Sequence, residues 1–452
     1  MARAKLLRWF HAGVAAVDAR QRVRAVLAPQ PVPPRWHLLA VGKAATDMAQ
    51  GALEVWPTGC AGGVVVAPVG SKLPPTAESD SVGGSLLPTI GSKLPPTAES
   101  DSVGGSLLPT IGSKLPPTVE SVSVGASLLA TVAGAHPVPD ERSLAAGAAL
   151  LAYAAQLATP EHRDEPVLLL VSGGASALAE VLQPNITLAD LQALTHAALA
   201  DGADIVELNR RRRAVSQLKG GQLVRALGAP RVQALLVSDV PSDDPAVIGS
   251  GLACGAEPET RPAMLQVVAR LEDALDAMLA AAHADGCALQ RLPGRFAGEA
   301  AAVAGQFVDE CLQRGAGTGV LWGGESTVVL PAEPGRGGRN QHLALAAAID
   351  LAGRVERAAR DGSSDPTQLL LLAAGTDGID GNSEDAGALV DGDTALRGEV
   401  GLGVTAVAAL AAANSGAFLE ASGDLVHTGR TATNVGDILV AWWPDAPRQG
   451  LT

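Results

Sequence analysis

The chain has 452 residues, a formal net charge of −14 and 47% hydrophobic residues, and only 2% of its residues are aromatic. This acidic balance argues against general nucleic-acid binding, which needs a basic surface. No stretch approaches the roughly 18 apolar residues of a membrane-spanning helix, and the N-terminus lacks the apolar core of a secretory signal. Because the four cysteines are widely spaced and form no CxxC pair, we expect free thiols and a cytoplasmic protein.

A 21-residue repeat lies in the first third of the chain. Residues 70–90 and 91–111 are the same string, and residues 112–132 are a diverged third copy. Each copy contains Pro-Pro, Gly and several Ser residues, with only short apolar pieces. We therefore expect an irregular or weakly ordered surface insertion at 70–132 rather than a solenoid.

Elsewhere, short apolar runs alternate with helical patterns. Strands are predicted to begin near Trp36, Gly62, Pro166, Val232, Thr318, Ser326, Gln368 and Gly436. Helices are predicted over Ser143–Leu157 and Leu188–Leu199, and the Ala-rich segment Ala263–Glu310 is expected to be mostly helical and to connect two lobes. Continuous apolar strands alternating with helices are typical of parallel sheets covered on both faces. The sequence predicts an α/β protein with a Rossmann-like, doubly wound domain at 1–314 and a smaller α/β domain at 315–452.

Candidate functional residues follow the predicted strands, where helix N-termini also present free N–H groups. Lys43, in VGKAA, can reach a phosphate, although a solvated lysine at a helix end explains it equally well. The turn VSGGASA either binds an anion or needs glycine only for steric reasons. Its candidate residues are Ser172, Gly173, Gly174 and Ser176. Asp239 ends another strand and suits Mg²⁺, whereas Asp243 and Asp244 are expected to cap a helix.

The second half of the chain carries the densest group of charged residues. Glu325 is predicted to lie in a Gly-bounded turn between two strands. Arg339 and Asn340 follow in GRGGRN, a loop suited to binding phosphate or carboxylate. Asp377 and Asp380 come after a further strand and could bind metal, accept a hydroxyl proton or merely form a turn. The segment HTGRTATNVGD offers hydroxyl and amide donors, among them Thr428 and Asn434.

In this order the motifs resemble those of the glycerate 2-kinase family, whose members have often been labelled hydroxypyruvate reductase. The resemblance runs from Val41 to Val440, apart from the repeat. It is carried by VGKAATDMA, AHPVPDE, SGGASAL, ELNRRRRAVSQLKGGQL, SDVPSDDPAVIGSG, GGESTVV, GRGGRNQHLAL, GTDGIDG and TGRTATNVGD. Each motif is modest, but nine of them in the family's order are specific.

The resemblance implies an active site in the cleft between the two domains, the second being the family's Leu-rich, MOFRL-type domain. It implies transfer of the ATP γ-phosphoryl group to the 2-hydroxyl of D-glycerate with a divalent metal, for which we expect Mg²⁺ held by Asp239 and Asp377. Lys43 and Arg339 match the family's active-site Lys and Arg. Three further positions match charged residues that line the cleft, namely Lys219, Glu325 and Asp377. The oligomeric state stays open, with a homodimer as one option.

Five positions depart from the family's pattern: Ala214, Leu252, His342, Arg430 and Ala432. They put substrate preference in question but leave the Lys, Arg and Asp set intact. One alternative is an NAD(P)H-dependent hydroxypyruvate reductase, yet the chain contains no GxGxxG motif with a following acidic residue. The other alternative is a non-catalytic binding protein that uses the repeat for interaction.

Overall fold

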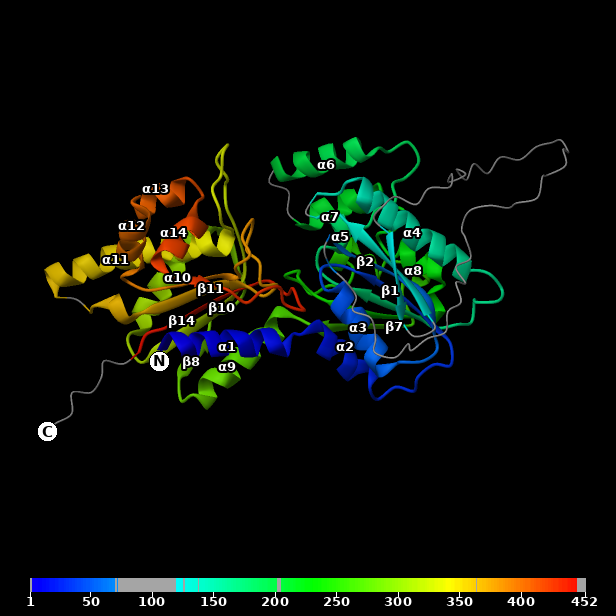
Figure 1. The fold of residues 1–452 in the computed structure, drawn as a ribbon, viewed down its shortest axis with the longest axis horizontal. Helices are drawn as coiled ribbons and strands as arrows, with labels where there is room; N and C mark the ends of the chain where they lie inside the picture. The colour runs from blue at the N-terminus through cyan, green and yellow to red at the C-terminus, as the bar shows by residue number, and fades with distance from the viewer. Residues whose placement is uncertain are drawn as a thin grey trace.

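The computed structural model describes residues 2–69, 71, 119–124, 127–136, 138–200, 205–362 and 364–444. These residues form two α/β lobes that lie next to each other, each built on a seven-stranded sheet (Figure 1). The predicted two-domain α/β fold class is thereby confirmed. Within the described residues, no helix combines the length and apolarity that crossing a bilayer requires.

The first sheet has the strand order β3-β4-β2-β1-β5-β6-β7, and all neighbours are parallel except the edge strand β3. Its strands are β1 (Trp36–Val41), β2 (Cys60–Pro68), β3 (Val119–Val124), β4 (Ser127–Gly134), β5 (Val167–Val171), β6 (Val232–Val237) and β7 (Met264–Ala269). Its helices are α2 (Ala19–Leu27), α3 (Ala45–Val55), α4 (Glu141–Leu157), α5 (Ala175–Leu178), α6 (Leu188–Ala200), α7 (Ile205–Ala214) and α8 (Gln222–Leu227). Leu38 and Ala40 share a core cluster with α3, whereas Leu39 and Val41 share one with α4 and α8. This two-sided burial explains why β1 is apolar at every position except His37.

The second sheet is mixed, with the order β13-β12-β11-β14-β10-β8 and β9 also paired to β10. Its strands are β8 (Ala288–Arg291), β9 (Phe296–Glu299), β10 (Thr318–Thr327), β11 (Leu370–Gly375), β12 (Gly387–Val390), β13 (Leu425–Val426) and β14 (Asp437–Trp442). Its helices are α9 (Leu271–Ala284), α10 (Ala300–Arg314), α11 (Arg339–Asp361), α12 (Thr394–Leu402), α13 (Ala406–Ala411) and α14 (Ser415–Ser422). Leu371 and Ala373 pack towards α10 and α11, and Leu372 and Ala374 face the opposite cluster, which contains α9.

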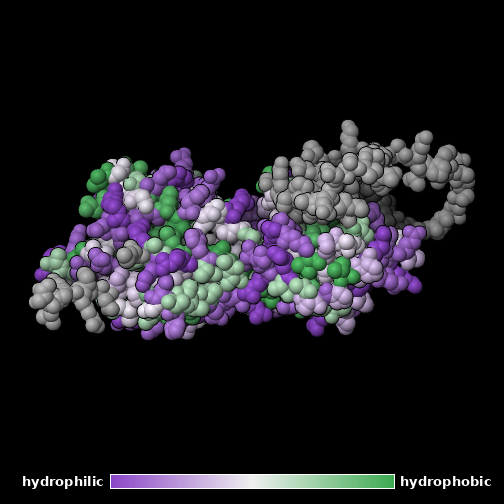
Figure 2. Space-filling model, turned by 60° about the horizontal axis from the view of Figure 1, so that its bottom comes forward, coloured by the Kyte–Doolittle hydropathy of each residue, from purple (hydrophilic) through white to green (hydrophobic). Residues whose placement is uncertain are grey.

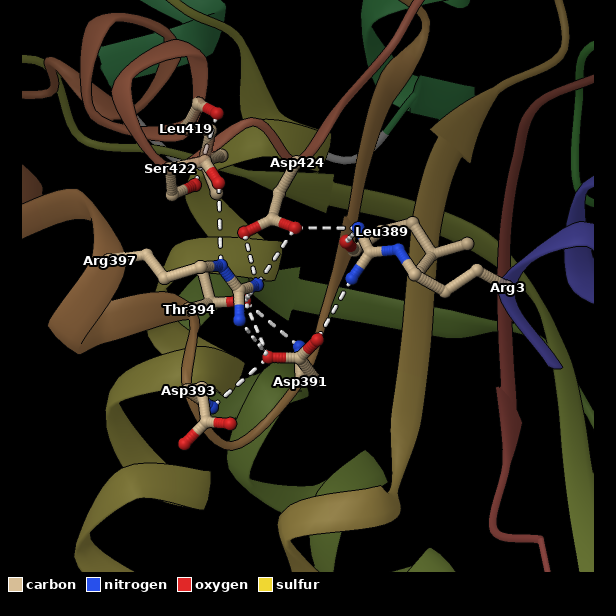
Figure 3. Close-up of polar contacts among 9 residues, drawn as sticks. All are labelled: Arg3, Leu389, Asp391, Asp393, Thr394, Arg397, Leu419, Ser422 and Asp424. Atoms are coloured by element: carbon tan, nitrogen blue, oxygen red, sulfur yellow. Dashed lines mark hydrogen bonds and ion pairs between the residues drawn. The ribbon is translucent and has the colours of Figure 1, made fainter. Parts of the chain in front are cut away.

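The N-terminal helices connect the two lobes. Helix α1 (Ala2–Ala16) packs on α9 of the second lobe, whereas α2 packs on α3 of the first. One apolar cluster runs through both lobes as a result. Arg3 anchors α1 to the second lobe through ion pairs with Asp391 (2.9 Å) and Asp424, both of which also pair with Arg397 (Figure 3). On the face shown in Figure 2, hydrophilic side chains cover most of both lobes and hydrophobic ones form smaller groups between them.

Several local predictions were wrong. The segment Ala263–Glu310 contains strands β7, β8 and β9 as well as two helices. Because β8 and β9 pair with β10, the second sheet begins before the predicted boundary at residue 315. Strand β10 continues through Glu325, so the predicted turn and the separate strand near Ser326 do not exist. The third repeat copy contributes β3 and most of β4 instead of an irregular excursion, and the first two copies lie outside the described residues apart from Ser71.

Candidate active site between the lobes

The carboxyl ends of β1, β5 and β6 face two loops of the second lobe, the turn at 376–378 and the segment 427–436. Lys43 follows β1, and its Nζ lies 3.0 Å from Oδ2 of Asp377, which follows β11. This ion pair joins residues 334 positions apart in sequence. Both side chains are partly exposed, at 29% and 21%. The contact therefore marks an accessible cleft where a lysine from one lobe meets a carboxylate from the other.

The glycine turn after β5 interlocks with the turn after β1. The Lys43 N–H donates to the Gly173 carbonyl at 2.9 Å, and the Ala44 N–H donates to the Ser172 hydroxyl at 3.0 Å. A Cβ atom at Gly173 would overlap the Asp239 carboxylate and lie 2.7 Å from Nδ2 of Asn434. The glycine therefore permits a close approach of three segments, and it brings Asp239 and Asn434 to the same place as the backbone of the turn.

Asp239 follows β6 and is the carboxylate best placed to accept a proton. Burial raises its pKa to about 6, and the negative charge of Glu325 adds to this effect. The positive charge of Lys43 and a hydrogen bond from the Gly174 N–H act in the opposite direction. A carboxylate with a pKa nearer to neutral is a better general base than an ordinary aspartate, while it stays largely ionised at pH 7.

A pocket of about 160 Å³ opens beside Asp239 in the first lobe. Its lining residues are His136, Gly174, Ser176, Ala177, Asn209, Arg212, Asp239, Val240, Val247 and Gly249. Burial lowers the pKa of His136 to about 4, and the nearby charge of Lys43 contributes. His136 is therefore neutral at physiological pH, so Arg212 and Asp239 are the charged groups of the pocket lining.

On the second lobe, the turn after β11 and the segment before β14 are built against each other. The Thr431 hydroxyl donates to the Thr376 carbonyl at 2.6 Å, and the Thr431 N–H donates to the Asp377 carbonyl at 3.2 Å. Gly378 has φ +79°, and a Cβ atom there would overlap the Gly429 carbonyl. Thr428 donates only within its own turn, to Gly429 at 2.8 Å. This packing fixes the Asp377 backbone and places Asn434 near the glycine turn.

Arg339, at the start of α11, is held by two carboxylates. Its Nε and Nη2 atoms lie 2.6 and 3.1 Å from the two oxygens of Asp437, and Nη1 pairs with Glu325. Burial alone would lower the pKa of Arg339, but Asp437 and Glu325 raise it. The role of Arg339 in binding phosphate or carboxylate stays a prediction, and in the structure its Nε, Nη1 and Nη2 atoms already contact carboxylates of the protein. Arg339 and Glu325 still lie close enough to Asp239 for the Glu325 charge to affect that residue.

Asp380 and Asn340 have a structural role at the start of helix α11. The Asp380 carboxylate accepts the N–H groups of Asn340 (3.1 Å) and Gln341 (2.7 Å) and so caps α11. Burial raises the pKa of Asp380 to about 7, while these two backbone hydrogen bonds act against the change. Asn340 is buried, and its amide also contacts Asp380 at 3.3 Å. Of the alternatives for Asp380, the structure therefore favours the structural one.

Lys219 lies apart from the pocket lining. Its side chain is only 1% exposed and forms an ion pair with Glu180, which is 0% exposed. Burial lowers the pKa of Lys219, although Glu180 opposes the change. The expectation that Lys219 lines the cleft is therefore corrected, because its ammonium group is buried against Glu180.

Sequence reasoning passed over four residues of the site: His136, Asn209, Arg212 and Asp437. His136 follows β4, a strand hidden in the repeat. Asn209 and Arg212 lie in ELNRRRRAV, which carries the family resemblance but does not show which side chains face the pocket. Asp437 begins β14 and pairs with Arg339, although it lies 98 residues later in the sequence.

The acidic residues of the site fit a magnesium ion that is bound together with phosphate. Within the described part of the chain, three side chains that could bind a metal lie close together, His37, His162 and Glu165. They lie at the amino ends of β1 and β5 and do not belong to the candidate site. Asp239 and Asp377 supply one carboxylate each from the two lobes. Magnesium commonly takes only one or two protein carboxylates, because substrate phosphates and water provide its other oxygens.

Comparisons with known proteins agree with this architecture. Residues 5–282 match the model of a domain of unknown function, DUF4147, and residues 318–437 match the MOFRL family. The chain is 32% identical over 345 residues to D-glycerate 2-kinase of Thermotoga maritima, covering 68% of this chain and 78% of that protein. It is 37% identical to an Agrobacterium vitis protein provisionally named hydroxypyruvate reductase, covering 67% and 75%. The crystal structure of glycerate kinase from Thermotoga maritima superposes with a TM-score of 0.70 at 26% identity, covering 98% of this chain and 99% of that one.

Proposed function

Because the chain belongs to the DUF4147/MOFRL glycerate kinase family, we propose that it transfers the γ-phosphoryl group of ATP to the 2-hydroxyl group of D-glycerate. The observation that carries this proposal is the meeting of Lys43 and Asp377 across the cleft, beside Asp239. Phosphoryl transfer requires little covalent chemistry from the protein, and depends mainly on positioning and on stabilising negative charge.

In the proposed reaction, the 2-hydroxyl oxygen of glycerate forms a bond to the γ-phosphorus while the bond to the β,γ-bridging oxygen breaks. Asp239 accepts the hydroxyl proton. Lys43 stabilises the charge on the transferred phosphoryl group, and ADP leaves with the bridging oxygen. In the turn at Ser172–Gly174, the Gly174 N–H already donates to Asp239 and so helps to hold this carboxylate in place.

Magnesium would be held by Asp239 and Asp377, and it would neutralise charge on the phosphate oxygens. In the described structure Asp377 already pairs with Lys43. Lys43 and the ion would therefore compete for the same oxygen, or share the phosphate between them.

The test uses the purified full chain with ATP, Mg²⁺ and D-glycerate, and phosphorus NMR of the product. We expect 2-phosphoglycerate and ADP in equal amounts. The Lys43→Met variant should lose at least about 100-fold in kcat, as is typical when a group that stabilises transition-state charge is removed. Lys5→Met is the matched control, since Lys5 lies on α1 and contacts Asp285 and Cys287 far from the cleft.

Two outcomes would contradict the proposal. A product phosphorylated at C3 would exclude the 2-kinase assignment, and undiminished turnover in Lys43→Met would exclude the role of that lysine. Hydroxypyruvate with NADPH is assayed in parallel by absorbance. Oxidation of NADPH without consumption of ATP would favour the reductase alternative.

A further inference from the structure

Three cationic side chains surround the candidate site, and they differ in what they already bind. Lys43 pairs with Asp377, and Arg339 pairs with Asp437 and Glu325. Among the described residues, none forms a hydrogen bond or an ion pair with the guanidinium of Arg212. Arg212 is therefore the cation of the site whose guanidinium is not paired with a described carboxylate.

The guanidinium of Arg212 is also partly removed from solvent. It lies half-buried on α7 and lines the pocket next to Asp239. Burial lowers its pKa, with Glu180 acting weakly in the opposite direction. Glu180 cannot serve as its partner because that carboxylate is already bound to Lys219 and Ser216. A desolvated guanidinium without a counter-ion favours binding of an anion that can pair with it.

A hydrogen-bonded polar cluster lies at the pocket, formed by Ser176 and Asn209 of the lining and by the fully buried Ser250. The hydroxyl groups of Ser176 and Ser250 lie 2.7 Å apart, and the Ser250 hydroxyl donates to Oδ1 of Asn209 at 2.8 Å. Ser250 has φ +58° and stands between Gly249 and Gly251, which are also left-handed. A non-glycine residue in this region costs free energy, and such strain gathers at ligand sites. The hydrogen bonds therefore hold the lining residues Ser176 and Asn209 in place against the buried Ser250.

The size and the charges of the pocket define its ligand. Its volume of about 160 Å³ lies below the roughly 300–1,000 Å³ typical of sites for drug-sized ligands, so it suits an acid of a few carbon atoms rather than a nucleotide. Arg212 supplies the positive end and Asp239 the proton-accepting end. A small 2-hydroxy acid has complementary groups, with its carboxylate next to its hydroxyl.

We propose that this pocket binds the acceptor substrate and that Arg212 binds its carboxylate through the two-pronged face of the guanidinium. The inference rests on the proposed function, and it assigns the acceptor to the first lobe beside Asp239. Arginine is suited to this task because its planar fork matches the two oxygens of a carboxylate.

Steady-state kinetics of Arg212→Gln test the proposal. Since hydrogen bonds to a charged group are involved, we expect the KM for D-glycerate to rise about 10- to 100-fold, with the KM for ATP changed less than about two-fold. Arg212→Lys should recover part of the loss, because it keeps the charge but not the fork. Arg210→Gln is the matched control, as it removes the same charge from an exposed position on the same helix. An unchanged KM for glycerate in Arg212→Gln overturns the proposal.

A second measurement separates this inference from the proposed function. Thermal shift is recorded without ATP, using D-glycerate, related small 2-hydroxy acids and their uncharged amides. We expect an acid to raise the Tm of the wild type and of Arg210→Gln but not of Arg212→Gln, and the amides to have no effect. If the wild type fails to phosphorylate glycerate but shows this Arg212-dependent shift, the kinase assignment fails and the carboxylate site stands. If amides stabilise as well as acids do, or no acid stabilises, the carboxylate site is wrong.

Discussion

Replacing Asp239 by Asn should stabilise the protein while it abolishes activity. Burial raises the pKa of Asp239 from its usual 3.8 to about 6. The folded state therefore holds this proton more tightly than the unfolded state does. The stabilising contribution is fully present below about pH 4 and is lost as the pH rises through about 6. The difference between the two pKa values corresponds to ~3 kcal/mol, and we expect roughly 1–3 kcal/mol because the pocket admits water.

The assay is urea unfolding of wild type and Asp239→Asn between pH 4.5 and 8, with EDTA present and without nucleotide. The amide has no charge to desolvate, so the advantage of the variant in free energy of unfolding should be small at pH 4.5 and reach its full size by pH 7.5. The kcat should fall at least about 100-fold, the usual contribution of a general base. Equal stability of the two proteins across this pH range, or a variant that is less stable at pH 7.5, would refute the reasoning.

Three further substitutions test the structural basis of the site. Lys219→Met leaves the Glu180 carboxylate buried without its partner, so the free energy of unfolding in urea should fall by about 3–5 kcal/mol. The double variant Lys219→Met with Glu180→Leu should regain much of that loss. Equal destabilisation of the single and the double variant would contradict a buried ion pair. Gly378→Ala places a Cβ against the Gly429 carbonyl at φ +79°, so kcat should fall at least about ten-fold with a lower Tm; full activity would show that the turn is not held in this way. Arg3→Ala removes the ion pairs that anchor α1 and should increase amide hydrogen exchange in α1 by ten-fold or more, against unchanged exchange in α4.

Two of the predicted strands that were confirmed are almost wholly apolar. The run VLLLV of β5 is apolar at every position, and WHLLAV of β1 at every position except His37, because helices cover both faces of the sheet. Strands β7 and β8 alternate exposed and half-buried residues along much of their length, so they present no such run and were assigned to a helical segment. Strand β4 begins within the repeat, whose Pro and Gly residues predict irregular structure and not a strand.

The closeness of Lys43 and Asp239 could be anticipated from the sequence because β1 and β6 are strands of one parallel sheet, and such strands end at the same edge. The meeting of these residues with Asp377, which follows β11 of the second sheet, was implied only by the family resemblance. The state of each side chain could not be anticipated. Arg339 was predicted to bind an anion, but Asp437, from a strand 98 residues later, already takes two of its donors. Lys219 was expected to line the cleft, but it lies buried against Glu180. Pairing between distant segments decides whether a charge is available to a ligand, and one sequence contains no direct signal of it.

The run Arg210–Arg213 shows the same limit at the scale of a single helix. Successive residues of an α-helix point about 100° apart, so four adjacent arginines cannot all face one pocket. In the structure, Arg212 lines the pocket, Arg213 donates to the Ala246 carbonyl at 2.9 Å and Arg210 is exposed. The sequence therefore predicts a cation in this segment. Which arginine faces the pocket depends on how α7 is rotated about its axis where it packs against residues 246–251. Arg210→Gln and Arg212→Gln make the same change of charge. We therefore expect the KM for glycerate to rise in Arg212→Gln and to stay unchanged in Arg210→Gln.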